Sequence, residues 1–464
     1  MKYSIGLIGL AVMGKNLAYN IADRGFPIAV YNRSAEKTRE AEAEYAKDTL
    51  KGFFSLEEFI SALESPKKVM LMVKAGSAVD ESIELLLPLL SPGDVIIDGG
   101  NSHYEDTERR TEYLREKGLL YLGTGVSGGE EGARNGPAVM IGGNKAAYEL
   151  VKPVLHAISA KAEGEDCCGF VGNGGAGHFV KMVHNGIEYA DMQLIGEAYA
   201  ILHTMLGLSA LELSSIFEEW NKGELESYLI SITSDIFKKT DEETGKPLVD
   251  LILDKAGQKG TGKWTGQISL ELGSPVPTIT SAVYDRYLSA KKEERVSASK
   301  VYSSPKISPQ ADKGLIESVR RALYASKICA YAQGFSMLKD ASASYGWNLD
   351  YAQIAKIFRG GCIIRAKFLT ELAKEFSSDN ALANILISPY FTRTIKNYEQ
   401  DWRRVISLAV ENGIAVSAFS SALSYFDNYR SAQMPMNLLQ AQRDYFGAHT
   451  YERTDKEGIF HTRW

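Results

Sequence analysis

The stretch YSIGLIGLAVMGKNLAYNIADRG, residues 3–25, decides the fold class of this chain. Residues 3–9 form a short apolar run of the kind that makes a buried strand. Behind it, Leu17, Ala18 and Ile21 recur at the spacing of one face of a helix. The stretch therefore predicts a strand, a tight turn and a helix, in that order.

The turn between these two elements carries a dinucleotide-binding pattern. Gly9, Ala11 and Gly14 keep the spacing of the fingerprint, with alanine at its middle position. Small residues there let the backbone approach a pyrophosphate, and the N–H groups at the helix start supply the positive end of a dipole. Glycine-rich turns also occur where only packing requires them, so the turn needs supporting context.

A second strand-like run, residues 26–34 (FPIAVYNRS), indicates which dinucleotide is bound. Enzymes that use NAD usually carry an acid at the end of this strand, about twenty residues beyond the first glycine, for the ribose hydroxyls. This chain has Asn32, Arg33 and Ser34 there. An arginine flanked by small polar donors can bind a 2′-phosphate that an acid would repel, so the sequence favours NADP.

Further strand-like runs alternate with helical stretches, which predicts a doubly wound, mainly parallel sheet. These runs are residues 68–75, 94–101 and 119–129. Ligands on such sheets bind beyond the carboxyl ends of the strands. The segments expected to open onto one crevice are 73–75, 99–101 and 127–129.

Helical periodicity replaces the strand pattern after a glycine cluster at residues 172–177. The expected parts are a Rossmann-like domain (1–176), a large all-helical domain (177–433) and a C-terminal tail (434–464). A tail of this kind docks on its own domain or on a partner subunit. Residues 197–202 and the helix after them resemble residues 333–338 and the helix after those, which indicates an internal duplication; ordinary helical recurrence is the alternative.

The bulk composition excludes several classes of protein. The 464 residues, 45% of them hydrophobic and 24% charged, have ordinary globular composition. A net charge of −6 argues against a nucleic-acid or anionic-membrane surface. The sequence lacks an apolar run of roughly 18 residues and the order of a signal peptide. The four cysteines have neither a disulfide framework nor metal-ligand spacing, so a cytoplasmic location is expected.

Two stretches of the helical domain carry polar side chains suited to a ligand. In KMVHNGIEY (181–189), Lys181, His184, Asn185 and Glu188 fall within one narrow arc of a helix. The alternative for this arc is a solvated face.

The second stretch, residues 251–266 (LILDKAGQKGTGKWTG), is expected to be an exposed, glycine-rich loop. Lys259, Thr261 and Lys263 give it anion-binding chemistry. The alternative is a surface loop without a ligand.

Six motifs together resemble the 6-phosphogluconate dehydrogenase family over nearly the whole chain. They are GLAVMGKNLAYN, IIDGGNS, GVSGGEEGA, GHFVKMVHNGIEY, ILDKAGQKGTGKW and QAQRDYFGAHTYER. The resemblance implies oxidative decarboxylation of 6-phosphogluconate to ribulose 5-phosphate with NADP, without a metal, in the pentose phosphate pathway. It implies that Lys181 is the general base on the C3 hydroxyl and that Glu188 is the acid that protonates C1 of the enediol. Base and acid would then face one small ligand from the same helix.

The resemblance also implies the binding residues and a homodimer. Residues matching the contacts to the substrate carboxylate and hydroxyls are Asn101, Ser127, Gly128, Gly129, His184 and Asn185. Those matching its phosphate ligands are Tyr189, Lys259, Thr261 and Arg286, joined by Arg443 and His449 from the second subunit. Those matching the NADP contacts are Gly9, Leu10, Ala11, Val12, Met13, Gly14, Asn32, Arg33, Ser34, Val73, Lys74, Ala75 and Asn101.

Two other functions compete with this one. A β-hydroxyacid dehydrogenase of the 3-hydroxyisobutyrate type shares the nucleotide domain and a lysine-bearing helix, but has no use for a phosphate cluster. A catalytically silent NADP-binding sensor would keep the glycine turn without a reason to keep Lys181 together with Glu188. Both residues are present, and the cluster around residues 259–263 favours a phosphorylated sugar acid.

Overall fold

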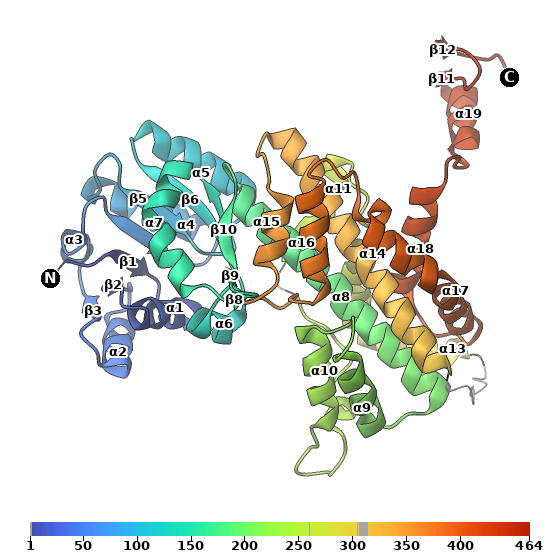
Figure 1. Cartoon of the computed structure of the whole chain (residues 1–464), viewed down its shortest axis with the longest axis horizontal. Helices are drawn as coiled ribbons and strands as arrows, with labels where there is room; N and C mark the ends of the chain where they lie inside the picture. Colours follow the sequence, from blue (N-terminus) through green and yellow to red (C-terminus); the bar gives the residue numbers. More distant parts are fainter. Residues whose placement is uncertain (1, 259, 304, 306–313) are drawn as a thin grey trace.

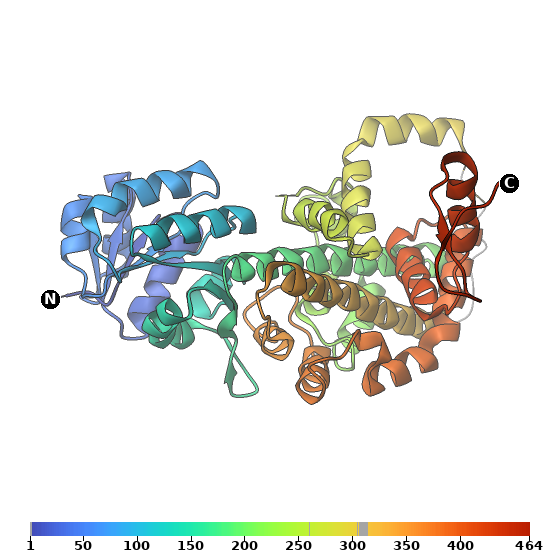
Figure 2. The same cartoon turned by 90° about the horizontal axis from the view of Figure 1, so that it is seen from above.

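A sheet domain and a helical domain lie side by side, and one long helix runs from the first into the second. The computed structural model describes residues 2–258, 260–303, 305 and 314–464. The connecting helix is α8 (Ala176–Leu206), which leaves the sheet domain and crosses the helical one (Figures 1 and 2). The expected fold class, a Rossmann-like domain followed by an all-helical domain and a tail, is confirmed.

The sheet has eight strands in the order β10-β7-β6-β5-β4-β1-β2-β3. Only β7 against β6 is antiparallel among its pairings, as expected for a mainly parallel sheet. Its strands are β1 Ile5–Ile8, β2 Ile28–Tyr31, β3 Leu50–Phe53, β4 Lys68–Leu71, β5 Val95–Asp98, β6 Leu120–Val126, β7 Val139–Gly143 and β10 Cys168–Gly172. A hairpin of β8 (Lys161–Ala162) and β9 (Glu165–Asp166) precedes the last strand.

Helices cover both faces of the sheet because neighbouring strand residues point to opposite sides. Leu7 packs in one apolar cluster with Leu17, whereas Ile8 packs in a second cluster with Ile83. The helices of this domain are α1 Val12–Asp23, α2 Ala35–Tyr45, α3 Leu56–Ser61, α4 Ser77–Leu86, α5 Tyr104–Glu116, α6 Gly129–Asn135 and α7 Lys145–Ile158. The sheet is therefore doubly wound, as its alternating pattern predicts.

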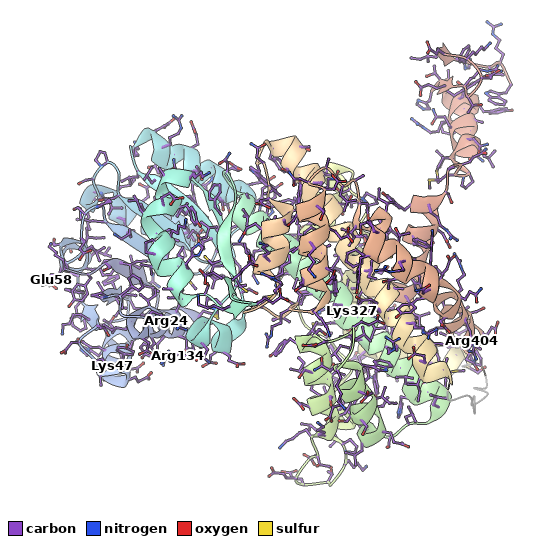
Figure 3. All side chains as sticks on the ribbon, in the orientation of Figure 1. Arg24, Lys47, Glu58, Arg134, Lys327 and Arg404 are labelled. Atoms are coloured by element: carbon purple, nitrogen blue, oxygen red, sulfur yellow. The ribbon has the colours of Figure 1, made fainter. Side chains whose placement is uncertain are left out.

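The helical domain is built around α8 and α14 (Gly314–Tyr345), which are 31 and 32 residues long. A Cβ on Gly334 would lie 2.5 Å from Ile187 Cδ1, so glycine lets these two helices pack closely. Lys327 and Asp191 form an ion pair of 2.9 Å between them, and each side chain is only 1% exposed. Figure 3 shows Lys327 within the helical domain. The surrounding elements are α9 Ala210–Trp220, α10 Tyr228–Lys238, η2 Leu248–Leu251, α11 Thr261–Leu272, α12 Pro277–Ala290, α13 Lys292–Val301, α15 Tyr351–Ile357, α16 Phe368–Ser378, α17 Pro389–Glu411 and α18 Ser417–Arg430.

The C-terminal tail extends away from the body of the chain (Figure 1). It comprises α19 (Met436–Gly447) and a hairpin of β11 (Tyr451–Glu452) and β12 (Ile459–Phe460). The buried carboxylate of Asp444 accepts hydrogen bonds from the backbone N–H groups of residues 450 and 462, from His461 Nδ1 and from Trp464 Nε1. Burial alone would raise the pKa of Asp444, but the donors of Thr462, His461 and Trp464, with the charge of His461, lower it to about 2. One side chain therefore organises the whole tail.

Glycines let the first turn of α8 sit directly on the sheet. A Cβ on Gly177 would lie 2.2 Å from the carbonyl oxygen of Gly123 and 2.6 Å from the backbone nitrogen of Gly142. A Cβ on Gly125 would lie 2.6 Å from Lys181 Cβ. No other residue type fits at these contacts without moving the backbone. The helix start is therefore fixed against β6 and β7.

We expect the substitution Gly177→Ala to lower the free energy of unfolding by about 3 kcal/mol, because the added methyl group meets rigid backbone on β6 and β7. Gly196→Ala, in the same helix, is the matched control, since a Cβ there has nothing within 4 Å. That control should stabilise the protein by about 0.5–1 kcal/mol, through helix propensity. Chemical denaturation measures both changes. Equal effects of the two substitutions would contradict the close approach of α8 to the sheet.

Candidate functional site

The carboxyl ends of β1, β4, β5 and β6 lie at one edge of the sheet, because these four strands are adjacent and parallel. The expected segments 73–75, 99–101 and 127–129 follow β4, β5 and β6 directly, so they share this edge. The helix α8 begins beside it. Candidate ligand groups from both domains therefore meet here.

The turn after β1 is shaped for close approach of a phosphate. Gly9 has φ +103°, and a Cβ on it would lie 2.5 Å from the carbonyl oxygen of Met72. A Cβ on Gly14 would lie 1.9 Å from the carbonyl oxygen of Gly9. The residue before α1 is Ala11, which has no side-chain oxygen to accept from the helix N–H groups. These groups can therefore serve an anionic ligand.

A cavity of about 430 Å³ lies beside this turn. The expected cofactor residues that line it are Gly9, Asn32, Arg33, Ser34, Val73 and Lys74. Asn32 Oδ1 also accepts a hydrogen bond from the backbone N–H of Leu10 at 3.0 Å, which ties the second strand to the turn. The other expected cofactor residues lie outside this lining: Leu10, Ala11, Val12, Met13, Gly14, Ala75 and Asn101.

Lys37 also lines the cavity, and it is absent from the residues expected from the sequence. It lies in the first turn of α2, four residues after Arg33. Two cations at the end of β2 suit a 2′-phosphate better than one. The sequence does carry a signal for Lys37: it is a basic residue in the first turn of the helix that follows the second strand.

In the polar arc of α8, Lys181 and His184 are buried and Asn185 and Glu188 are half-buried, so the alternative of a solvated face is wrong. Lys181 is 8% exposed and His184 is 0% exposed. Lys181 Nζ donates a hydrogen bond of 2.8 Å to Ser127 Oγ, and Ser127 Oγ lies 3.5 Å from His184 Nε2. The chain continues through His184 Nδ1 to Asn185 Oδ1 at 2.9 Å and from Asn185 Nδ2 to Thr261 Oγ1 at 3.0 Å. The helix, the turn after β6 and the start of α11 thus form one polar network.

Burial moves the two proposed proton-transfer groups in opposite directions. It lowers the pKa of Lys181, which the negative charge of Glu188 offsets only in part. It raises the pKa of Glu188, against the opposing charges of Lys181 and Arg286. The pKa of His184 is lowered well below its usual value, first by burial and then by the charge of Lys181. The amine is thus suited to losing a proton and the carboxyl to keeping one.

The turn after β6 is held against the helical domain. Gly128 has φ +108°, and a Cβ on it would lie 2.5 Å from the carbonyl oxygen of Gly361. Gly129, with φ +63°, has open space around it. Asn101 is exposed in the turn after β5. Both turns therefore present backbone or amide groups to the shared edge.

The expected phosphate ligands are only partly assembled in the described residues. The guanidinium of Arg286 stacks over the ring of Tyr189 at 3.6 Å and donates to the carbonyl oxygen of Gly257 at 3.1 Å. Thr261 opens α11 beside Asn185. Lys259 lies outside the described residues. Arg443 Nη1 donates a hydrogen bond to Gln440 Oε1 within the projecting tail, and His449 packs edge-on against Phe446 in the same segment.

The expectation of one exposed loop over residues 251–266 is wrong in its second half. The helix α11 begins at Thr261, so Gly262 and Gly266 are helical. A Cβ on Gly262 would lie 2.5 Å from the ring of Tyr189, which shows that this glycine serves packing between α11 and α8. Trp264 meets the ring of His103 edge-on at 5.1 Å and so joins α11 to the turn after β5.

A cavity of about 520 Å³ elsewhere in the chain does not compete with this site. Its cations are already engaged: Arg359 pairs with Glu163 at 2.8 Å, Lys367 pairs with Glu226 at 3.6 Å, and Arg365 stacks over the ring of Tyr228 at 3.8 Å. It is lined by neither glycine turn nor α8. We therefore assign the chemistry to the edge of the sheet.

Comparison with known proteins identifies a family over both domains. Residues 4–172 match the model for the NAD binding domain of 6-phosphogluconate dehydrogenase, and residues 177–464 match the model for its C-terminal domain. The NADP(+)-dependent, decarboxylating 6-phosphogluconate dehydrogenase of Bacillus subtilis is 60% identical, covering 100% of this chain and 99% of that one. The decarboxylating enzyme of Escherichia coli is 57% identical over the same shares.

A solved structure agrees with these matches. The 6-phosphogluconate dehydrogenase of Plasmodium falciparum, described in its apo form and in complexes with NADP+ and with 6-phosphogluconate, has a TM-score of 0.97 and 46% sequence identity. The match covers 99% of this chain and 100% of that one. Among the described residues, no helix is long and apolar enough to cross a membrane.

We expect Arg33→Glu to weaken NADP binding by about tenfold or more while changing NAD binding little, because only NADP carries the 2′-phosphate. Arg39→Glu is the control, because this substitution makes the same change of charge at a residue of α2 that does not line the cavity. Titration of both variants with each dinucleotide measures the effect. Equal losses for NADP and NAD would contradict a 2′-phosphate role for Arg33.

Proposed function

The chain belongs to the 6-phosphogluconate dehydrogenase family, and on that premise we propose that it converts 6-phosphogluconate to ribulose 5-phosphate and CO2 while NADP is reduced. The observation that carries the proposal is the buried contact of 2.8 Å between Lys181 and Ser127 at the sheet edge, with Glu188 two turns along the same helix. This reaction places the enzyme in the oxidative pentose phosphate pathway and in gluconate utilization.

Lys181 is the proposed general base. Oxidising the C3 alcohol requires removal of its hydroxyl proton, and NADP, when bound, accepts the hydride. Burial lowers the pKa of Lys181, so this side chain loses its proton more readily than a surface lysine does. Its hydrogen-bond partner Ser127 is a hydroxyl and not a carboxylate, and the charge of Glu188 offsets the lowering of its pKa only in part. Burial therefore favours the neutral amine, which is the form that can accept the hydroxyl proton.

Glu188 is the proposed general acid. The 3-keto acid formed by oxidation loses its C1 carboxylate as CO2, because the adjacent carbonyl accepts the electron pair. The resulting enediol must then be protonated at C1. Burial raises the pKa of Glu188, so its carboxyl can hold the proton that this step needs.

The other groups of the edge are proposed to bind the substrate and the cofactor. Asn101, Ser127, Gly128, Gly129, His184 and Asn185 would hold the carboxylate and hydroxyls; Tyr189, Lys259, Thr261 and Arg286 would hold the phosphate. The hydrogen bond between Asn185 and Thr261 supports this grouping, because it joins a residue proposed to hold the carboxylate and hydroxyls to one proposed to hold the phosphate. The cofactor residues are those named from the sequence, with Lys37 added to Arg33 at the 2′-phosphate.

A homodimer is proposed in which each tail completes the other subunit's site with Arg443 and His449. Support comes from the tail itself, which projects from the body of its own chain (Figure 1). It exposes large apolar side chains, among them Leu438 at 64%, Tyr445 at 70% and Phe446 at 73%. Exposed apolar surface of this extent is typical of a protein interface.

We also propose the division of the chain into residues 1–176, 177–433 and 434–464, and a cytoplasmic location. The end of β10 at Gly172 and the start of α8 at Ala176 support the first boundary. An internal duplication is supported by the placement of its two halves: residues 197–202 and 333–338 each lie in a long helix that a shorter one follows. The four cysteines are buried and unpaired, which suits a reducing compartment.

The proposed reaction predicts equal amounts of NADPH and CO2 from 6-phosphogluconate and NADP in the presence of a chelator. Unphosphorylated gluconate and 3-hydroxyisobutyrate should react poorly, because neither engages the phosphate ligands. Absorbance of NADPH and trapping of CO2 in one assay measure both products. Reaction with 3-hydroxyisobutyrate instead would establish the other β-hydroxyacid activity, and no reaction would favour the NADP sensor.

Within the same assay, Lys181→Ala should abolish turnover while NADP binding remains nearly intact. In the wild type, kcat/KM should fall as the pH falls through the pKa of Lys181, because the protonated amine cannot accept the hydroxyl proton. The pH at which kcat/KM falls should lie below about 10.4, the pKa of an ordinary lysine, because burial lowers the pKa of Lys181. Normal turnover by Lys181→Ala would contradict the assignment of the base.

Arg443→Ala should raise the KM for 6-phosphogluconate, whereas Arg453→Ala should not, since Arg453 pairs with Asp455 within the tail. Mixed dimers of Lys181→Ala and Arg443→Ala chains give a sharper test. One site of each mixed dimer would combine an intact Lys181 with an intact partner Arg443. Statistical exchange should then restore about a quarter of wild-type activity at low substrate concentration. No recovery on mixing would contradict the shared site.

A further inference from the structure

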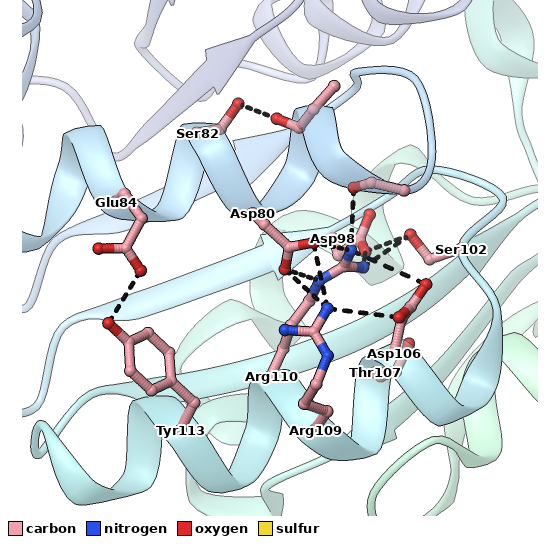
Figure 4. Close-up of polar contacts among 12 residues, drawn as sticks. Asp80, Ser82, Glu84, Asp98, Ser102, Asp106, Thr107, Arg109, Arg110 and Tyr113 are labelled. Atoms are coloured by element: carbon pink, nitrogen blue, oxygen red, sulfur yellow. Dashed lines mark hydrogen bonds and ion pairs between the residues drawn. The ribbon is translucent and has the colours of Figure 1, made fainter.

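A buried arginine in α5 links two of the turns at the ligand edge, although it lies outside the cavity beside them. Arg110 is 0% exposed. Its guanidinium forms a two-pronged pair with the carboxylate of Asp80, from Nε at 2.8 Å and from Nη2 at 3.0 Å (Figure 4). Asp80 lies in the first turn of α4, the helix that follows the 73–75 segment. Arg110 thus ties α5 to the start of α4.

The same guanidinium also reaches the turn after β4. Arg110 Nη2 donates to the carbonyl oxygen of Gly76 at 3.0 Å. Gly76 follows Val73, Lys74 and Ala75 directly and precedes α4, with φ +93°. A backbone carbonyl held at this point fixes the path by which the chain leaves the proposed cofactor segment.

On its other side Arg110 reaches the turn after β5. Arg110 Nη1 lies 3.4 Å from Ser102 Oγ and 3.5 Å from Asp98 Oδ2. Ser102 Oγ donates to the same carboxylate at 2.6 Å, and Tyr121 OH donates to it at 3.0 Å. The other carboxylate oxygen of Asp98 accepts from the backbone N–H of Gly100 at 3.1 Å. The bonds at Gly100 and Ser102 bracket Asn101.

Only a guanidinium can make these contacts together. Its planar fork carries five N–H donors in fixed directions, whereas a lysine ammonium is a single point on a flexible stem. Arg110 uses one edge for Asp80 and the remaining N–H groups for Gly76 and the Ser102–Asp98 pair. Because the group is buried, the carboxylates of Asp80 and Asp98 also offset the cost of removing its charge from water.

We propose that Arg110 is a positioning residue for NADP binding: its guanidinium sets the distance between the turn after β4, with Val73 to Ala75, and the turn after β5, with Asn101. The inference rests on the proposed function, because those turns matter as cofactor-binding segments. Arg110 itself does not line the cavity, so it acts through the two turns that it joins.

The chain offers a matched control on the same two helices. Tyr113 OH, about one turn further along α5, donates to Glu84 Oε1 of α4 at 2.8 Å (Figure 4). This bond also joins α5 to α4, but it touches neither turn. Tyr113→Phe removes a link between the helices and leaves both turns as they are.

The test compares wild type, Arg110→Lys, Asp80→Asn and Tyr113→Phe at a temperature where each is folded. NADPH fluorescence gives the Kd of the cofactor without substrate, steady-state kinetics give KM for NADP and kcat, and thermal unfolding gives Tm. Arg110→Lys should weaken NADPH binding about tenfold and raise KM for NADP in parallel, since small displacements of binding groups have effects of this size. Asp80→Asn should weaken binding about threefold, because the fork loses its charged partner.

Tyr113→Phe should keep wild-type cofactor affinity even if its Tm falls. Arg110→Lys with a lower Tm and unchanged NADPH affinity would overturn the proposal, because Arg110 would then be merely structural. If Arg110→Lys does not fold, Asp80→Asn decides: wild-type affinity in that variant overturns the proposal. Fluorescence needs no turnover, so a wild type that fails to oxidise 6-phosphogluconate would reject the proposed function and leave this test intact.

Discussion

The seating of α8 on the sheet is the constraint from which the rest of the site follows. Gly177 meets the backbone of β6 and β7 with no room for a Cβ, and Gly125 leaves space for the Cβ of Lys181. One helical turn beyond that contact, the amine of Lys181 reaches Ser127. Backbone packing, and not a side-chain interaction, therefore fixes the position of the proposed base.

Burial, with a hydroxyl as hydrogen-bond partner, gives Lys181 its chemical character. The chain holds a second buried lysine for comparison: Lys327 lies against Asp191 at 2.9 Å, in a paired arrangement that suits a structural cation. Lys181 donates to a neutral hydroxyl instead, and burial lowers its pKa. The nearby Glu188 has its pKa raised by the same burial. Burial on one helix thus shifts the pKa values of the proposed base and the proposed acid in opposite directions, each toward its proposed role.

The sequence predicts the local parts of this architecture well and the long-range parts poorly. The strand, turn and helix of residues 3–25 and the order of the later strands follow from periodicity and from glycine spacing, which are local properties. The second half of the 251–266 stretch was wrongly expected to be a loop, because Gly262 lies within a helix and allows packing against the distant Tyr189. Lys37 was not predicted, although its position four residues after Arg33, in the first turn of the next helix, is a local signal.

The contacts of Arg110 could not be predicted from the sequence. In the sequence it is one of two adjacent arginines on a charged helix, typical of a solvated face, and its neighbour Arg109 is indeed half-exposed. Its partner Asp80 is 30 positions away, and the contact forms only when the fold brings side chains of α4 and α5 together (Figure 4).

The tail also holds side chains in defined positions, in this case for the proposed partner subunit. A group supplied by a second chain is useful only if it arrives in a defined position, since ordering a flexible segment on binding lowers affinity. Asp444 meets that requirement within the tail, because its carboxylate gathers the backbone N–H groups of residues 450 and 462 with His461 and Trp464. Arg443 precedes this carboxylate and His449 precedes Thr450. His461, the backbone of residue 462 and Trp464 therefore help to shape the segment that carries both proposed phosphate ligands within a single chain, through their hydrogen bonds to Asp444.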